Sequence, residues 1–439
     1  MRKEIRYLIV SVIIFLICAS VVVSGEEKLT LDQFITNAIR DNESIRIAME
    51  AISGAEAKIL ESKSQYLPQI TLSANYSRVS NTGELQMPLN GEMRTFKFST
   101  PNNLSMKLGI SEQVFNWGKT AKTIKLNEIG TAISQENVNQ VKLNISYQLV
   151  PIFYGILFTN QAIKVLDDTS NLFKQKLEIA RERYKVGLAS DFDLSLLEVQ
   201  ISTINSQKLD LFNNIRKWNL IYNRIAGRPS EAIFEPEGVL DFEVFDIKTG
   251  DLLAEADVNR VDVKILDHQD IQAKTQEKIL ETNNKPTVTA LLNYEFRNGI
   301  MPEITKIKGT WSAVLSASYP LFDGHKTRAQ VAQARTNINI IEKQKNELQK
   351  TIELEIKEGI EDIKTIEQKI DIEKIKISHA EKALKIAEER FRNGMISTTD
   401  FIDAQTSLEN ARLNHLQLIF NHILSRYSIF RSVGRRLCE

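Results

Sequence analysis

Two aspartates one helical turn apart, Asp400 and Asp403, are the residues of this chain whose type and spacing best suit a chemical role. They follow a stretch rich in Ser and Thr, where a helix is expected to begin. Carboxylates at a helix N-terminus are favoured by the unpaired backbone N–H groups and by the helix dipole. On these residues alone, we predict that the two aspartates cap a helix.

Other residue patterns give no sign of catalysis. His415 and His422 lie seven residues apart, with no Cys or carboxylate on the same helix face to complete a metal site. No nucleophile elbow, phosphate-binding loop or zinc motif is present. The chain is therefore not expected to be an enzyme, and we predict neither a cofactor nor a metal.

The aspartates belong to a motif that the sequence contains twice. The stretches RERYKVGLASDFD (181–193) and EERFRNGMISTTD (388–400) align at an offset of 207 residues, which places Gly187 on Gly394, Ser190 on Ser397 and Asp193 on Asp400. A charged helical run that ends at Gly and restarts at Ser or Thr is typical of a tight turn between two helices. The repeat predicts two helical hairpins, with tips at 187–193 and 394–400.

The segments around these tips have the pattern of very long helices. Apolar residues at consecutive heptad positions predict a coiled-coil helix over about 326–393: Ile356, Ile363, Ile370, Ile377, Leu384, Phe391. Its counterpart covers about 118–186, with a kink expected at Pro151. Tyr184 and Phe391, each three residues before a tip glycine, are expected in the coiled-coil core. At 1.5 Å per residue each helix would span roughly 100 Å. Return helices are expected over 193–226 and 400–433, and one further helix opens each repeat, over 30–66 and 251–283.

Four segments alternate apolar and small polar residues with a period of two. They predict strands at 69–79, 104–115, 287–296 and 310–322, joined by loops at 80–103 and 297–309. Strands of this length with one apolar face match a transmembrane β-barrel, although a half-buried soluble sheet has the same alternation. The apolar residues expected to face lipid are Ile70, Leu72, Tyr76, Leu104, Met106, Leu108, Val288, Leu292, Tyr294, Trp311, Leu315 and Tyr319.

Composition and the N-terminal residues indicate the cellular location of the protein and limit its possible partners. The 439 residues carry 56 charges of each sign, which argues against nucleic acid as a partner. Residues 1–25, with three basic residues before an apolar core, predict a secretory signal peptide, and an uncleaved membrane anchor is the alternative. After cleavage Cys438 would be the only cysteine. We predict a first repeat over 26–227, an irregular acidic linker over 228–250, and a second repeat over 251–439.

Four strands per chain have a direct consequence for assembly. An open sheet edge is not tolerated in lipid, and the smallest single-chain barrels have eight strands. Several copies must therefore share one barrel, so two chains would give eight strands and three would give twelve.

The order of helix, strand pair, long helix, Gly tip and return helix, repeated twice, resembles the TolC-type outer membrane efflux family. The motifs that carry the resemblance are LTLDQFITNAIRDN, YLPQITLSANYS, YPLFDGHKT and GMISTTDFIDAQTSLENAR, over about 29–436. The resemblance implies a mainly α fold with a membrane β-barrel: a homotrimer with twelve strands in the outer membrane lipid and a coiled-coil helical tunnel in the periplasm. It also implies an exit duct for multidrug efflux or type I secretion, docked tip-first on a periplasmic adaptor and an inner-membrane transporter.

The resemblance also assigns roles to the tips. Asp400 and Asp403 match carboxylates that form acidic rings at the entrance, where like charges attract cations and raise each other's pKa. The adaptor-contacting tip maps onto Gly187, Leu188, Ala189, Ser190 and Asp193, and onto Gly394, Met395, Ile396 and Ser397. In the family an Asp at position 193 can pair with an Arg at position 396, but here Ile396 prevents that latch.

One alternative of another class remains open. A periplasmic coiled-coil scaffold or adaptor, anchored in the inner membrane by Leu8–Val23, would explain the heptads but not the four strands. The sequence does not identify the exported substrate.

Overall fold

The computed structural model describes residues 27–80, 82–246 and 248–438. The expected signal peptide at 1–25 lies outside these residues. The chain divides into two compact units. Among the described residues, the first comprises 27–46, 139–246, 248–260 and 349–438, and the second comprises 47–80, 82–138 and 261–348.

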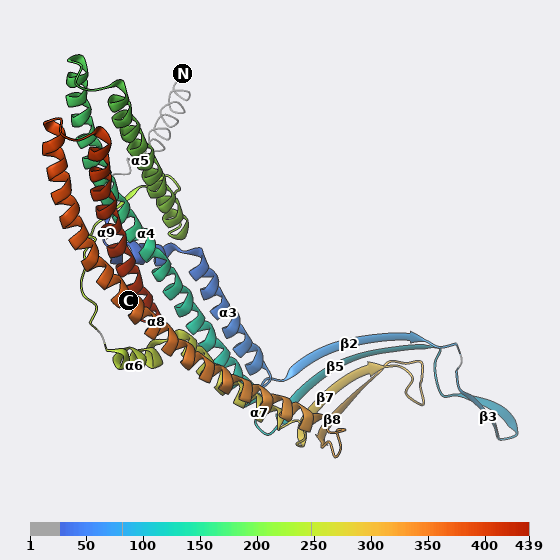
Figure 1. Ribbon diagram of the computed structural model, residues 1–439. Helices are drawn as coiled ribbons and strands as arrows, with labels where there is room; N and C mark the ends of the chain where they lie inside the picture. The colour runs from blue at the N-terminus through green and yellow to red at the C-terminus, as the bar shows by residue number, and fades with distance from the viewer. Residues whose placement is uncertain (1–26, 81, 247, 439) are drawn as a thin grey trace, which may run out of the picture. The chain divides into compact units, whose positions relative to one another are not determined.

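The chain forms two helical hairpins (Figure 1), whose tips and return helices belong to the first unit, while residues 119–138 and 326–348 of the long helices belong to the second. One is formed by α4 (Lys119–Lys185) and α5 (Asp191–Ile225), the other by α8 (Lys326–Arg392) and α9 (Thr398–Ser432). The long helices have 67 residues each and the return helices 35 each, so the duplication extends to helix length. Helix α4 continues through Pro151 without interruption.

Four of the six heptad positions predicted in α8 are buried, and the other two, Ile377 and Leu384, are half-buried. Ile356, Ile363 and Ile370 are at most 1% exposed, and Phe391 is 3% exposed. Tyr184, predicted to lie in the core as the counterpart of Phe391, is instead 48% exposed. That prediction was wrong: Phe391 is covered by the stacked ring of Phe401 and by Arg183, whereas Tyr184 is not part of the apolar cluster around them.

Each repeat opens with two helices where the sequence predicted one. The first repeat has α2 (Leu31–Asp41) and α3 (Glu43–Ser64), and the second has α6 (Thr249–Asn259) and α7 (Val261–Leu280). The breaks fall at Asn42 and Arg260, which have extended backbone. Neither break has a Pro or Gly to announce it, which is why helical periodicity runs across both.

A hydrogen bond to the return helix holds each break in place. Asn42 Nδ2 donates to the carbonyl of Ile225 at 2.7 Å, and Arg260 Nη1 donates to the carbonyl of Ser432 at 2.9 Å. Ile225 and Ser432 are 207 residues apart, the same offset as the two tips. The two repeats therefore use different side chains to reach the same backbone position.

The linker between the repeats is not wholly irregular. Its strand β6 (Phe234–Pro236) pairs in parallel with β1 (Glu27–Leu29). Further along, the amide of Phe245 donates to Glu367 on α8, and Leu240 is buried among Ile370, Ile419 and Ile423.

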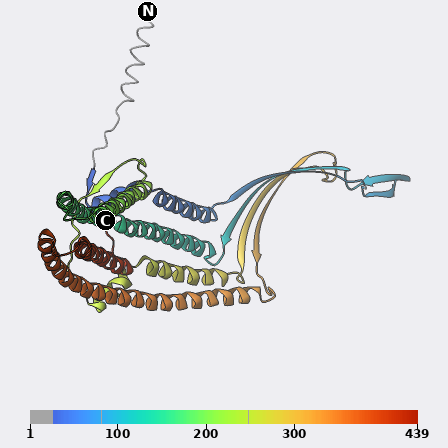
Figure 2. The same cartoon turned by 45° about the horizontal axis from the view of Figure 1, so that its top comes forward.

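The second unit contains a four-stranded antiparallel sheet in the order β2-β5-β7-β8 (Figure 2). The strands are β2 (Gln69–Arg78), β5 (Asn102–Phe115), β7 (Thr287–Arg297) and β8 (Lys308–Ser318). All four predicted strands exist, but β8 begins and ends earlier than expected, so Tyr319 follows the strand instead of lying in it.

The segment 80–103, predicted to be a loop, contains a second hairpin. Strands β3 (Glu84–Leu89) and β4 (Glu92–Lys97) pair around Asn90 and Gly91, whose φ angles are 58° and 86°. An Asn-Gly pair with positive φ at both positions is the favoured type I′ hairpin turn. The Asn90-Gly91 pair is visible in the sequence, but the prediction of a loop rested only on the loop-forming tendency of Gly, Pro and Asn.

The link at the first helix break leads to a test. Asn42 is 7% exposed and serves two helices, because its Oδ1 also accepts from the amide of Ile45 at 3.2 Å. Asn42→Ala removes both bonds and should cost about 2 kcal/mol. Asn42→Asp keeps the oxygen that caps α3 but cannot donate to Ile225, so it should lower the melting temperature by a smaller amount.

Thermal unfolding of the detergent-solubilised protein, followed by circular dichroism, measures both effects. Asn414→Ala, at an exposed position on α9, is the matched control and should leave the melting temperature almost unchanged. Equal melting temperatures for Asn42→Ala and the control would contradict this role of Asn42.

Candidate functional site: hairpin tips and strand faces

The two hairpin tips share one backbone conformation. Gly187 and Gly394 have φ angles of +76° and +72°, a region that favours glycine. One residue later, Leu188 donates to the carbonyl of Arg183 at 2.8 Å, and Met395 donates to that of Arg390 at 2.9 Å. These bonds satisfy carbonyls at the end of the long helix, so each tip is a hydrogen-bonded C-terminal helix cap.

A matching capping box opens each return helix. Ser190 Oγ accepts from the amide of Asp193 at 3.2 Å, and Asp193 Oδ2 accepts in return from the amide of Ser190 at 2.9 Å. In the second hairpin Ser397 and Asp400 make the same two bonds, at 3.0 and 3.1 Å. The predicted cap at Asp400 is confirmed, whereas Asp403 lies exposed one turn into the helix.

These hydrogen bonds favour the ionised carboxylates. Bonds from Ser397 hold the pKa of Asp400 below its usual value, and bonds from Ser190 and then Thr398 do the same for Asp193. Within one chain the shift is therefore opposite to the rise expected in a ring of like charges. The cap keeps Asp400 charged, which a cation-attracting ring requires.

The two hairpins are joined at the tips by a contact that the sequence did not suggest. Thr398 on α9 is 5% exposed, and its hydroxyl lies close enough to Asp193 of α5 to lower the pKa of that carboxyl. Arg183 adds a second link, since it donates to the carbonyl of Arg392 and lies 5.3 Å from the ring centre of Phe391. Ile396 is half-buried against the apolar core, so it contributes packing where the family latch would have a charge.

The tips expose apolar side chains on a charged protein. Leu188 and Met395 are 78% and 73% exposed, and Val186 and Phe192 are each 69% exposed. Apolar side chains gathered at the end of a rod are typical of a surface that another protein covers. Of the other tip residues, Ala189 and Asp193 are half-buried, and Gly187, Ser190, Gly394 and Ser397 are exposed.

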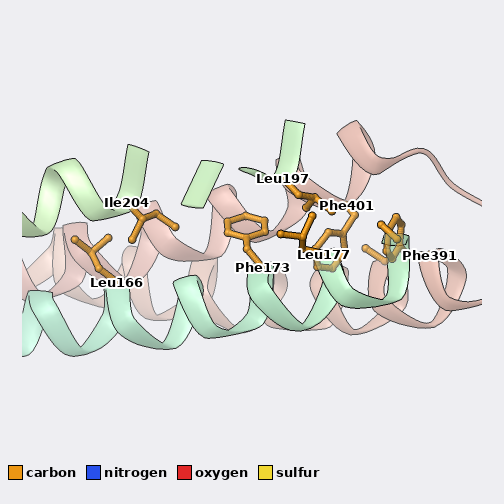
Figure 3. Packing of buried hydrophobic residues seen from close by; sticks show 9 residues of the cluster. Leu166, Phe173, Leu177, Leu197, Ile204, Phe391 and Phe401 are labelled. Carbon is orange, nitrogen blue, oxygen red and sulfur yellow. The ribbon is translucent and has the colours of Figure 1, made fainter. Parts of the chain in front are cut away.

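An aromatic cluster beneath the tips holds the four helices together (Figure 3). The rings of Phe391 and Phe401 stack with centres 5.0 Å apart, and Phe173 meets Phe401 edge-on at 6.2 Å. Lys176, also missed by the sequence analysis, is 6% exposed; its Nζ lies 5.4 Å from the Phe401 ring centre and 3.5 Å from a Glu388 carboxylate oxygen.

His422 is a packed core residue. His422 is 1% exposed, its Nε2 lies 3.2 Å from Glu367 Oε1, and its ring meets Phe242 edge-on. Within residues 27–80, 82–246 and 248–438, no group of three or more His, Cys, Asp or Glu side chains is placed to hold a metal ion.

One face of the sheet in the second unit is a continuous apolar surface. Register places Leu72 opposite Leu108, Leu108 opposite Tyr294, and Tyr294 opposite Trp311, so the apolar rows cross all four strands. Most of the residues predicted to face lipid are between 43% and 73% exposed: Ile70, Leu72, Tyr76, Leu104, Met106, Leu108, Leu292, Tyr294, Trp311, Leu315 and Tyr319. Val288 alone is half-buried.

The opposite face is mainly polar, apart from Leu291 and Val314, which lie opposite each other on β7 and β8. One row across the sheet reads Ser73, Lys107, Glu295 and Thr310, and the next reads Thr71, Gly109, Asn293 and Ser312. A sheet with an exposed apolar face and an exposed polar face fits a wall between lipid and water.

The fold and these two surfaces define an outer membrane channel protein, and comparison with known proteins agrees. A sequence profile described as outer membrane efflux protein matches residues 34–218 and 252–433. The chain belongs to this outer membrane efflux protein family and is located in the outer membrane. That location argues against the inner-membrane-anchored scaffold.

Relatives and solved structures resemble the whole chain. Outer membrane protein TolC of Escherichia coli is 19% identical over 426 residues, which are 92% of this chain and 82% of TolC. Outer membrane efflux protein BepC of Brucella suis is 19% identical, over 95% of this chain and 88% of BepC. The crystal structure of CusC has a TM-score of 0.76 at 13% identity, and covers 92% of each chain. The CmeC outer membrane channel of Campylobacter jejuni has a TM-score of 0.75 at 18% identity, over 92% of this chain and 85% of CmeC. These relatives are channel proteins and not enzymes.

Proposed function

We propose that three copies of this chain form a twelve-stranded barrel and a helical tunnel, which together act as an exit duct across the outer membrane. The observation that carries the proposal is the sheet: four strands, one exposed apolar face, and two edges, β2 and β8, with no partner strand among the described residues. Pairing β8 of one copy with β2 of the next would remove both edges, and three copies would close the ring.

The hairpin tips are proposed to dock on a periplasmic adaptor fed by an inner-membrane transporter. Their exposed apolar side chains support this role, led by Leu188 and Met395. We propose that Asp400 and Asp403 ring the entrance and concentrate cations there. Each chain would contribute a first repeat (26–227), a linker (228–250) and a second repeat (251–439) to the wall.

Neighbouring positions on one strand test the lipid-facing assignment. Leu315 and Ser316 are both exposed on β8 but point to opposite faces of the sheet. Leu315→Lys would place a charge in lipid and should cost about 2–4 kcal/mol near the membrane midplane. Ser316→Lys would place it in the water-filled lumen at little cost and is the matched control.

The measurement is the amount of heat-modifiable protein in the outer membrane fraction. We expect a strong loss for Leu315→Lys and near-normal levels for Ser316→Lys. Equal levels, or a larger loss for Ser316→Lys, would contradict the assignment of the two faces.

A second test concerns the entrance. Because Asp400 also caps α9, its neutral replacement should keep the hydrogen-bonding shape, so the variant is Asp400→Asn with Asp403→Asn. Single-channel recordings should show block by multivalent cations in the native protein and at least tenfold weaker block in the double variant, since the ring charge that attracts them is gone.

The control for that experiment is Glu358→Gln with Asp362→Asn, two exposed carboxylates on α8 well away from the tips. This pair should leave the block unchanged. Unaltered block in the Asp400 and Asp403 variant would refute the acidic entrance.

A further inference from the structure

A groove in the first unit lies between the two hairpins, and neither the tips nor the sheet explains it. It is lined by α4 of the first hairpin and by α8 and α9 of the second. Its volume of about 360 Å³ is within the range that suits a small organic ligand. Arg412, which lines it, is 14 residues after Thr398, the first residue of α9, so the groove sits roughly 21 Å along the helix from the tip.

Part of the groove is apolar. Val165 of α4, Ile377 of α8 and Leu416 of α9 line it, and all three side chains are half-buried. Ile377 is a heptad position of α8, whereas Ile370 and Ala380 in the same seam are 0% and 8% exposed. The coiled-coil seam is therefore incompletely covered at Ile377, and the groove leaves apolar surface there open to a ligand.

The charge along the groove is positive. Lys164 and Arg412 line it, and no carboxylate of the described residues does. Arg412 is already paired with Glu381 at 2.8 Å. Lys164 is exposed and has no ion pair among the described residues. An uncompensated cation beside an apolar surface is complementary to an anion that carries an apolar group.

His415 adds an unused hydrogen-bonding atom to the same groove. Its Nδ1 is buried and has no hydrogen-bond partner among the described residues. Burial lowers the pKa of His415, and Lys374 on α8 lowers it further against an opposing effect of Glu373. The ring is therefore neutral near pH 7, and one of its two tautomers can donate a proton from Nδ1. A buried polar atom without a partner costs free energy that a bound acceptor would recover.

We propose that this groove binds a small amphipathic carboxylate, whose apolar body lies on Val165, Ile377 and Leu416. Its carboxylate pairs with Lys164 and accepts a hydrogen bond from Nδ1 of His415. A ligand in this position contacts both hairpins, so its binding stabilises their contact. The site goes beyond the proposed duct, because it lies within one chain and needs neither a trimer nor conduction.

Naphthoate, a two-ring aromatic carboxylate, is the probe. Its binding to the full-length protein in lipid nanodiscs is measured at pH 7 by ligand-observed NMR, and empty nanodiscs give the background due to lipid. We expect saturable binding to the native protein. Naphthylmethylamine has the same rings with a positive charge and should not bind. Naphthylmethanol, which is neutral, should bind about fivefold more weakly than naphthoate, since it lacks the ion pair.

Variants of the native protein separate the two polar contacts. Lys164→Gln should weaken naphthoate binding about fivefold, because it removes an ion pair at an exposed position. Lys164→Arg keeps the positive charge and should retain most of the affinity. Lys217→Gln removes an exposed lysine from α5, which does not line the groove, and is the matched control. His415→Phe keeps an aromatic ring without Nδ1 and should weaken binding by a similar factor, about fivefold.

Absence of saturable naphthoate binding to the native protein, or equal affinity for naphthoate and naphthylmethylamine, would overturn the proposal. Unchanged affinity in Lys164→Gln would overturn it as well. The comparison of the probes decides the matter by itself if His415→Phe does not fold. Conductance across a planar bilayer reports separately on the duct. A protein that binds naphthoate but never conducts would refute the duct and leave the groove standing, and one that conducts without binding would do the reverse.

Discussion

The structure depends on one constraint: backbone N–H and C=O groups cannot be left unpaired in lipid. Among the described residues, β2 and β8 have no further partner strand, so a single four-stranded sheet placed in lipid would violate this constraint even though its strands have a suitable length and an apolar face. Exposed apolar residues such as Trp311 and Leu315 would be a liability in a soluble protein and are needed in a membrane wall. This constraint is the reason for proposing that several copies of the chain assemble into one barrel.

The duplication explains how one chain builds a wall and a long helical rod. Both repeats end their return helix on a glycine that lies against the break between the two helices that open the repeat, Gly227 against Asp41 and Gly434 against Arg260. Both breaks are bonded to the carbonyl of the residue two positions before that glycine, by Asn42 in one repeat and by Arg260 in the other. The two repeats therefore share the position of the helix break and of the carbonyl bonded to it, although the side chain that makes the bond differs. That is consistent with sequence identities near 19% to relatives that match over nearly the whole length.

Features fixed by local periodicity could be predicted from the sequence, and features fixed by distant contacts could not. The heptad spacing of apolar residues predicts the long helices, and the alternation of apolar and polar residues predicts the four strands, because each pattern repeats within one element. The break at Arg260 depends on the carbonyl of Ser432, and Arg183 at one tip donates to the carbonyl of Arg392, 209 residues away at the other. The burial of Gln405 could not be predicted either, since its helical face becomes a core face only when Thr169 of α4 packs on it.

The mass of the native complex, measured by mass spectrometry after gentle release from detergent, tests the central claim most directly. The account predicts a complex of three chains, which supplies twelve strands and leaves no open edge. A protein that leaves the membrane fraction as a stable single chain, with β2 and β8 unpaired, would contradict it.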